Sequence, residues 1–169
     1  MSDYDALMSL PILVADDDAD DRLLLKMAFA EQNIPNPVLF FKDGSEVTDY
    51  LYKLESQSDI QKDLPGLMLL DVNMPRKNGL QVLKEVKTHP IWQQICVCMF
   101  STARTEHYVS EAHQLGADNY MVKPDSYDDL LEVIQSVYLT WLNSVLVSKK
   151  IHPCSMDSVE KENTPVTHK

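Results

Sequence analysis

The sequence predicts a doubly wound α/β fold, in which a five-stranded parallel sheet is covered on both faces by five helices. Two observations carry this prediction. Short apolar runs alternate with stretches of helical composition, and the runs are continuously apolar instead of alternating with polar residues. Strands buried on both faces have this composition, and helical crossovers join them into a parallel sheet. The predicted strands are residues 11–16, 37–42, 66–71, 94–101 and 118–123.

The helical stretches show apolar residues three and four positions apart, and they are residues 19–32, 45–55, 79–89, 105–116 and 126–147. Asp18 is placed to cap the first helix, and Gly116 ends the fourth. The segment 56–65 is polar and turn-like. These boundaries predict an N-terminal segment, one domain and a polar, aperiodic tail that we expect to be disordered, at residues 1–10, 11–147 and 148–169.

The chain has 169 residues, 44% of them hydrophobic, and a net charge of −11. This composition is typical of a globular domain, and the negative charge argues against binding to nucleic acid or to an anionic membrane. The N-terminus, MSDYDALMSL, lacks the basic start of a signal peptide, and no apolar run approaches the roughly 20 residues that span a bilayer. We therefore expect a cytoplasmic protein with no nucleic-acid or membrane partner.

The three cysteines are odd in number and have no disulfide-framework spacing, which indicates reduced thiols. Cys96 and Cys98 lie in the strand-like run ICVCMF, and no histidine stands nearby at zinc spacing. We interpret both as small buried apolar residues instead of metal ligands.

Polar side chains follow four of the predicted strands at the point where each strand ends, which in doubly wound folds is where the site lies. Three acids follow the first strand and one acid the third, and a hydroxyl and a lysine follow the fourth and fifth: Asp16, Asp17, Asp18, Asp71, Ser101 and Lys123. Carboxylates gathered at one edge repel one another unless they bind protons or a cation. The chain offers oxygen ligands without a sulfur or imidazole set, which favours Mg²⁺ over zinc.

A carboxylate beside Mg²⁺ and a lysine is also able to act as a nucleophile on phosphorus. The metal and the lysine would neutralise charge on the transferring phosphoryl group. Asp71 is the acid that this arrangement favours, because it stands alone at the end of a buried strand and enters a loop bounded by Pro75 and Gly79. The sequence thus predicts that Asp71 is phosphorylated.

At these same positions the chain resembles the receiver domain of two-component response regulators. The matching motifs, in order, are ILVADD (12–17), LLDVNMPRKNG (69–79), FST (100–102) and YMVKP (120–124). Each motif is weak alone, but four of them at strand ends make a specific match over about residues 10–147. The resemblance implies a flavodoxin-like sheet of order 2-1-3-4-5 with an extended last helix.

The resemblance assigns Asp71 as the phospho-acceptor. It implies that Asp17 binds Mg²⁺ directly, that Asp16 acts through water and that the backbone carbonyl of Asn73 is the third protein ligand. The run of three acids leaves a second register open, in which Asp17 and Asp18 are the metal pair. The strand ILVA, which ends at Ala15, favours Asp16 and Asp17. The acids could instead be a helix N-terminal cluster favoured by the dipole, but Asp71 would then be unexplained.

On the phosphoryl side, the resemblance implies that Lys123 contacts the phosphoryl oxygens and that Ser101 is the switch hydroxyl. Tyr120 matches the aromatic residue that changes rotamer with the switch, although a plain core role for it stays open. The resemblance also implies a cis peptide bond between Lys123 and Pro124.

No helix-turn-helix, cyclase or kinase segment follows residue 147, so we expect a stand-alone receiver whose output is a protein contact. The long 56–65 segment, the extended last helix and the stretch YLTWLN (138–143) resemble the stand-alone regulators paired with bacterial phytochromes. This implies a sensor histidine kinase as partner, with the phytochrome type as a candidate. It also implies a homodimer formed by the helix at 105–116, the strand at 118–123 and the last helix.

The last helix carries an apolar stripe at helical spacing that runs past the length of a small sheet, through Ile134, Tyr138, Trp141, Leu142 and Val145. Beyond Tyr138 we expect this stripe to be exposed and to mark a partner or self-association site. The other interpretation is an intramolecular stripe that covers the sheet.

Other functions fit the sequence less well. An Asp-nucleophile phosphatase would need a general acid two residues after Asp71, where Asn73 stands. A nucleotide or flavin site would need a Gly-rich loop, and the chain has four glycines in all. A phosphorelay intermediate and a phosphorylation-independent interaction module on the same fold stay open. We therefore expect no enzyme activity beyond the protein's own phosphorylation and dephosphorylation.

Overall fold

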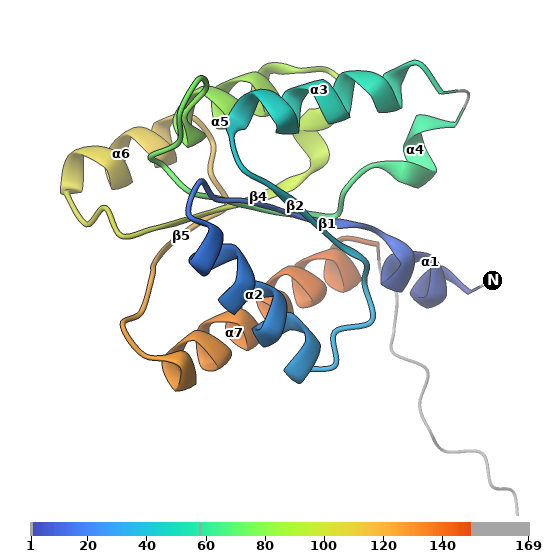
Figure 1. The fold of residues 1–169 in the computed structure, drawn as a ribbon. Coiled ribbons are helices and arrows are strands. Elements are labelled where there is room, and N and C mark those ends of the chain that lie inside the picture. Colours follow the sequence, from blue (N-terminus) through green and yellow to red (C-terminus); the bar gives the residue numbers. More distant parts are fainter. Residues whose placement is uncertain (1, 58, 150–169) are drawn as a thin grey trace, which may run out of the picture.

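The protein is a three-layer α/β domain, seen here in a computed structural model that describes residues 2–57 and 59–149 (Figure 1). Its central sheet has the strand order β2-β1-β3-β4-β5, and every neighbouring pair is parallel. The strands are β1 (Ile12–Ala15), β2 (Val38–Phe41), β3 (Leu67–Leu70), β4 (Cys96–Ser101) and β5 (Asn119–Val122). The predicted fold class and strand order are confirmed.

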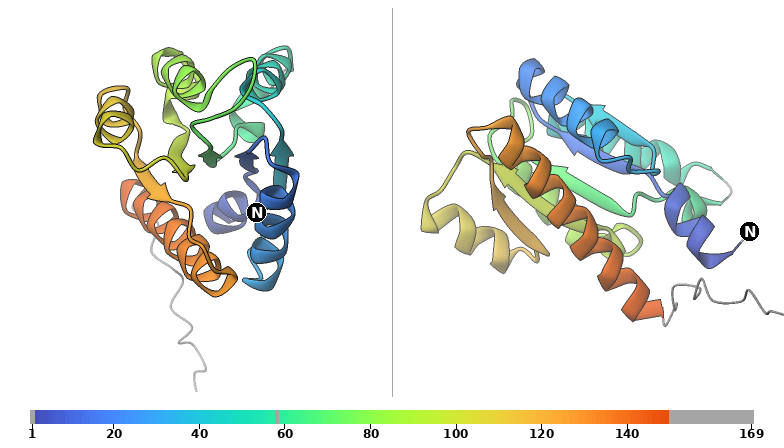
Figure 2. Two further views of the ribbon diagram at one scale, coloured as in Figure 1. Left: turned by 60° about the vertical axis from the view of Figure 1, so that its left-hand side comes forward. Right: turned by 90° about the horizontal axis from the view of Figure 1, so that it is seen from below.

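The sheet separates two apolar layers because successive side chains of a strand point to opposite faces. Leu13 and Met68 face the layer that holds α3 (Gly44–Glu55), α5 (Gly79–Thr88) and α6 (Glu106–Gln114). Ile12 and Leu67 face the opposite layer, which holds α2 (Ala19–Glu31) and α7 (Tyr127–Lys149). Helices α2 and α7 lie side by side on that face (Figure 2).

Three elements were not predicted: α1 (Asp3–Ser9), α4 (Ile60–Asp63) and a 3₁₀ turn at Trp92–Gln94. Helix α1 begins with a capping box between Ser2 and Asp5, and it buries Leu7 to 2% exposure. The N-terminal segment is therefore part of the packed domain. Helix α4 lies in the segment 56–65, and a single turn is too short to produce a periodic pattern. The tail from residue 150 onward lies outside the described residues.

The apolar stripe of α7 is not the exposed patch that we expected beyond Tyr138. Trp141 is 2% exposed, and a Cβ added at Gly66 would lie 2.4 Å from its ring. Leu142 and Val145 are half-buried and pack against the same core layer, which α1 extends. The intramolecular interpretation is correct because α1, invisible in the sequence pattern, lengthens the surface that α7 covers.

A buried polar residue joins α1 to α7. The side-chain amide of Asn36, in the turn before β2, donates to the carbonyls of Leu7 (3.0 Å) and Leu10 (2.9 Å). Its carbonyl oxygen accepts a hydrogen bond of 2.9 Å from the Tyr138 hydroxyl. Asn36 is 4% exposed, so these three bonds satisfy a side chain that would otherwise be costly to bury.

Within the described residues, α7 is long and apolar enough to cross a membrane by length and composition, with a mean hydropathy of 1.4. The expectation that no segment reaches this length is therefore wrong. Core helices of globular domains meet the same criterion, and α7 buries Ile134 and Trp141 against the sheet.

The thiols of β4 are shielded from solvent to different degrees. Cys98 is 1% exposed, and burial raises its pKa to about 12. Cys96 is half-buried, and burial raises its pKa to about 11. Both groups are therefore neutral thiols at neutral pH, which agrees with their prediction as apolar strand residues. Cys154 lies outside the described residues.

Candidate functional site

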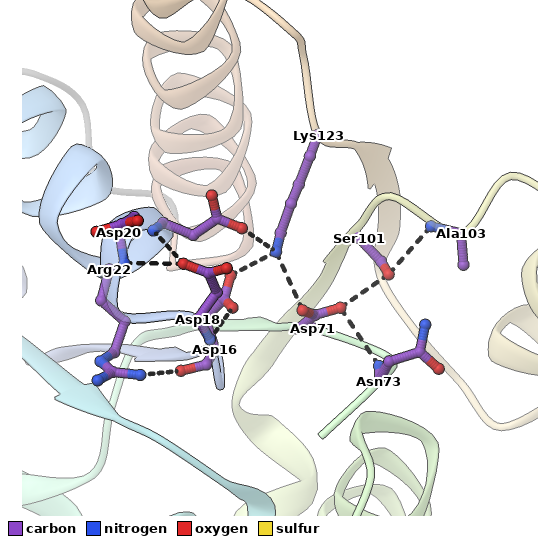
Figure 3. A network of polar contacts seen from close by, with 10 residues as sticks. Asp16, Asp18, Asp20, Arg22, Asp71, Asn73, Ser101, Ala103 and Lys123 are labelled. Atoms are coloured by element: carbon purple, nitrogen blue, oxygen red, sulfur yellow. Dashed lines mark hydrogen bonds and ion pairs between the residues drawn. The ribbon is translucent and has the colours of Figure 1, made fainter. Parts of the chain in front are cut away.

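The carboxyl ends of β1, β3, β4 and β5 meet at one edge of the sheet and bring the predicted polar residues together (Figure 3). Asp71 directly follows β3, and its backbone N–H donates to the Ala15 carbonyl at the end of β1, at 3.0 Å. Its side chain is 9% exposed. The central strands therefore hold a nearly buried carboxylate at the carboxyl edge of the sheet.

Three groups hold the Asp71 carboxylate. The Ser101 hydroxyl donates to Oδ1 at 2.8 Å, and the backbone N–H of Asn73 donates to the same oxygen at 3.3 Å. The Lys123 ammonium donates to Oδ2 at 3.0 Å. Ser101 is fully buried and Lys123 is 9% exposed, so these bonds act with little screening by water.

An acidic cluster surrounds this carboxylate. Oxygen atoms of Asp16, Asp17 and Asp71 lie within 4.8 Å of one another. Asp16 is 1% exposed, and burial raises its pKa to about 6 even though the hydrogen bond from Lys123 lowers it. Asp18 points away, because its carboxylate caps α2 by accepting from the N–H groups of Asp20 and Asp21. The geometry thus selects the register with Asp16 and Asp17 at the cluster.

The donor set of the cluster fits a divalent cation. Its ligand atoms are carboxylate oxygens, which magnesium, manganese and calcium prefer, and no sulfur or imidazole is among them. Two of the three cluster carboxylates, Asp16 and Asp71, pair with the Lys123 ammonium, and within the described residues no second cation pairs with the cluster. This leaves an excess of negative charge in a poorly solvated place. Asn73 contributes the N–H described above, and its carbonyl as a ligand stays a prediction.

Lys123 joins the site to α2 as well as to Asp71. Its ammonium lies 2.5 Å from Asp16, 2.9 Å from Asp21 and 3.0 Å from Asp71. Burial by itself lowers the pKa of Lys123, but its interactions with the carboxylates of Asp16 and Asp21 outweigh burial, and the pKa is raised. The amine is therefore charged at neutral pH. Sequence reasoning missed Asp21, although it stands four residues after Asp17, in the first turn of the helix that follows.

Tyr120 is connected to Ser101 through one residue. Its hydroxyl donates to the carbonyl of Ala103 at 2.6 Å, and the Ala103 N–H donates to the Ser101 hydroxyl at 3.3 Å. Burial and the negative charge of Asp71 raise the pKa of Tyr120. Ser101 thus already points at Asp71 in this structure, and Tyr120 is already directed at the loop after β4.

The loop between β3 and α5 is fixed by contacts that the sequence did not reveal. Arg76 has a φ of 62°, and its guanidinium pairs with Asp43, the buried N-cap of α3. A Cβ added at Gly79 would lie 2.0 Å from the Asp71 carbonyl oxygen, so only glycine fits where α5 begins. Both features position the segment that carries Asn73.

The implied cis bond is wrong, since the Lys123–Pro124 peptide is trans in this structure. Peptide bonds that precede proline tolerate both isomers at a small difference in free energy, so the residue type alone does not determine the isomer.

The fold and the cluster together define a class of signalling domain. A family model described as the response regulator receiver domain matches residues 12–135. The chain belongs to the response regulator receiver family.

The relatives that it resembles include stand-alone regulators. Response regulator Rcp1 of Synechocystis sp. is 29% identical over 145 residues, which cover 86% of this chain and 97% of that protein. The crystal structure of the phosphorylated cyanobacterial phytochrome response regulator RcpA is 28% identical, with a TM-score of 0.71, over 80% of this chain and 96% of that one. The Mn²⁺-bound form of Rcp1 is also 28% identical, with a TM-score of 0.67, over 79% of this chain and 94% of that one.

Proposed function

We propose that this protein is a stand-alone response regulator that accepts a phosphoryl group on Asp71 from a sensor histidine kinase and thereby switches a protein–protein interface. The observation that carries the proposal is the Asp71 carboxylate, held between the Ser101 hydroxyl and the Lys123 ammonium beside Asp16 and Asp17. The proposal includes a cytoplasmic location for the protein, because the phosphohistidine of such kinases is formed in the cytoplasm.

In the transfer step, a carboxylate oxygen of Asp71 attacks phosphorus, and the bond between phosphorus and the donor histidine nitrogen breaks as the oxygen–phosphorus bond forms. Lys123 offsets the negative charge on the phosphoryl oxygens, and Ser101 donates its hydroxyl hydrogen to one of them. Asp17, Asp16 through water, Asp71 and the Asn73 carbonyl would hold a Mg²⁺ ion, which supplies further positive charge at the phosphoryl group.

The conformational change caused by phosphorylation passes from Ser101 through Ala103 and Tyr120 to the surface formed by α6, β5 and α7. The hydrogen bonds that join these three residues support this route, because a change at Ser101 moves the loop on which Tyr120 depends. We propose that a second copy of the chain binds this surface. The similarity to the phytochrome response regulator RcpA and to the bacteriophytochrome response regulator AtBRR supports a phytochrome-type kinase as the donor.

The test is phosphorylation of the purified protein by acetyl phosphate, with and without Mg²⁺, followed by the intact mass. We expect a Mg²⁺-dependent gain of one phosphoryl group, and no gain in the Asp71→Asn variant. If no adduct forms, calorimetric titration with beryllofluoride and Mg²⁺ separates a short-lived adduct from an inactive site. Absence of both the adduct and beryllofluoride binding would overturn the proposal in favour of a phosphorylation-independent interaction module.

A further inference from the structure

The ammonium of Lys123 is shared among three carboxylates. It lies within 3.0 Å of Asp16, Asp21 and Asp71, and an ammonium group has three hydrogens to donate. Two of these contacts, to Asp21 and Asp71, are hydrogen bonds, and the contact with Asp16 is an ion pair. A phosphoryl group on Asp71 would therefore interact with a lysine ammonium that already pairs with carboxylates.

Asp21 differs from the other two partners. Asp71 is itself the proposed acceptor, and Asp16 belongs to the cluster whose oxygens lie within 4.8 Å of one another. Asp21 lies outside that cluster, in the first turn of α2, and its side chain is 38% exposed. It is the partner of Lys123 that neither the phosphoryl group nor a cation at the cluster would engage.

Asp21 also borders a cavity beside Lys123. Asp21 and Lys123 line a cavity of about 70 Å³ between α2 and the start of α7, together with Pro124 and Tyr127. Arg22 follows Asp21 in the same helix turn, but its guanidinium donates to the backbone carbonyl of Asp16 at 2.7 Å. It therefore does not neutralise the charge of the Asp21 carboxylate.

We infer that Asp21 is a positioning residue that withholds part of the Lys123 ammonium from the phosphoryl group on Asp71, and so weakens the hold of the site on that group. The inference rests on the proposed function and deepens it. A carboxylate 2.9 Å from the ammonium opposes the approach of a second anion to the same ammonium. The effect is moderate because Asp21 is partly exposed and is screened by water.

The test compares the affinity for beryllofluoride, a phosphoryl mimic, in saturating Mg²⁺ by calorimetry. Asp21→Asn keeps the size of the side chain and removes its charge. The matched control is Asp20→Asn, which removes the same charge from the adjacent, exposed residue, whose side chain is not a partner of Lys123. We expect Asp21→Asn to bind beryllofluoride roughly three- to five-fold more tightly than the natural chain, and Asp20→Asn to change by less than about two-fold.

The affinity for Mg²⁺ alone is the second readout, and we expect it to change by similar factors in the two variants because both lose one charge near the cluster. Equal tightening of beryllofluoride binding in both variants would overturn the inference, since long-range charge would then explain it. Unchanged or weaker binding by Asp21→Asn would also overturn it, because Asp21 would then support Lys123 instead of competing for it. If the natural chain binds no beryllofluoride, the proposed function fails and the inference fails with it.

Discussion

Asp16 shows how burial and charge compete at a single residue. It is 1% exposed, it lies beside the carboxylates of Asp17 and Asp71, and the ammonium of Lys123 is its nearby cation. The removal of its charge from water is not fully offset by Lys123, as the raised pKa of about 6 indicates. A cation at the cluster would supply the missing positive charge.

The Asp16→Asn variant should therefore be more stable than the natural chain when divalent cations are removed. At pH 7.5 in chelator we expect its free energy of unfolding to rise by about 1–2 kcal/mol, because a buried anion is replaced by a neutral amide of similar size. Saturating Mg²⁺ should stabilise the natural chain more than the variant, by preferential binding to the folded state. Urea unfolding under both conditions measures this, with Asp20→Asn, which removes the charge of an exposed residue outside the cluster, as the control.

A variant that is less stable than the natural chain in chelator would contradict this prediction. It would mean that the ion pair between Asp16 and Lys123 contributes more than the burial of the acid costs.

At the residue scale the sequence predicted which residues lie together at the carboxyl edge of the sheet, but not which contacts each of them makes. Asp16, Asp17 and Asp18 are identical in chemistry and adjacent in the chain, so composition alone left two registers open. The structure separates them because strand β1 ends at Ala15 and Asp18 is needed to cap α2. Asp21 went unnoticed because its importance comes from Lys123, 102 residues away in sequence.

At the scale of elements, the loop after β3 is held by the N-terminus of α3. Asp43 accepts from the Glu46 N–H at 2.9 Å and pairs with Arg76, whose Nε lies 2.9 Å from Oδ2. Burial raises the pKa of Asp43, but the hydrogen bond and the guanidinium outweigh burial, so the pKa is lowered from 3.8. The ionised form of Asp43 therefore stabilises the fold.

Replacement of Asp43 by Asn should destabilise the protein in a pH-dependent way. A lowered pKa contributes stability that is present above the unfolded-state value of 3.8 and is lost as the pH falls through the folded-state value. We expect a loss of about 2 kcal/mol at pH 7 that shrinks as the pH falls below 3.8. Urea unfolding at pH 7 and at acid pH measures it, and the exposed Asp49→Asn on the same helix serves as the control.

A loss of the same size at both pH values would show that the shape of Asp43, and not its charge, holds the loop.

Substitution of Asn36 tests the unpredicted contact between α1 and α7. Asn36→Ala leaves the Leu10 carbonyl without its side-chain donor and removes one of two partners from the Leu7 carbonyl and from the Tyr138 hydroxyl. We expect a loss of about 2–3 kcal/mol in the free energy of unfolding, because buried groups left unpaired cost more than the bond itself contributes. Tyr138→Phe removes one of the three bonds and should cost about 1 kcal/mol. Equal losses in the two variants would contradict a shared role for the Asn36 amide.

At the scale of the whole molecule, charge opposes the proposed homodimer. Each copy carries a net charge of −11, so two copies repel one another at low ionic strength. We expect sedimentation to show more dimer after phosphorylation than before, with a further increase when salt is raised from low ionic strength to about 0.15 M, where the screening length is about 8 Å. The Asp71→Asn variant, treated identically, should show no phosphorylation-dependent shift. A shift in that variant would show that dimer formation does not depend on phosphorylation of Asp71.

The sequence by itself determined the parallel sheet and the residues that gather at its carboxyl edge, and the resemblance to receiver domains implied the strand order. It could do so because strands buried on both faces leave a continuous apolar pattern, and because parallel strands deliver their ends to one place. It did not show that Trp141 is buried or that Asn36 joins two helices. Nor did it show that Arg76 pairs with Asp43, or that Asp21 pairs with Lys123. Those facts depend on residues that are distant in sequence and chemically ordinary one by one, and only tertiary packing, which sets their burial and their partners, gives them a role.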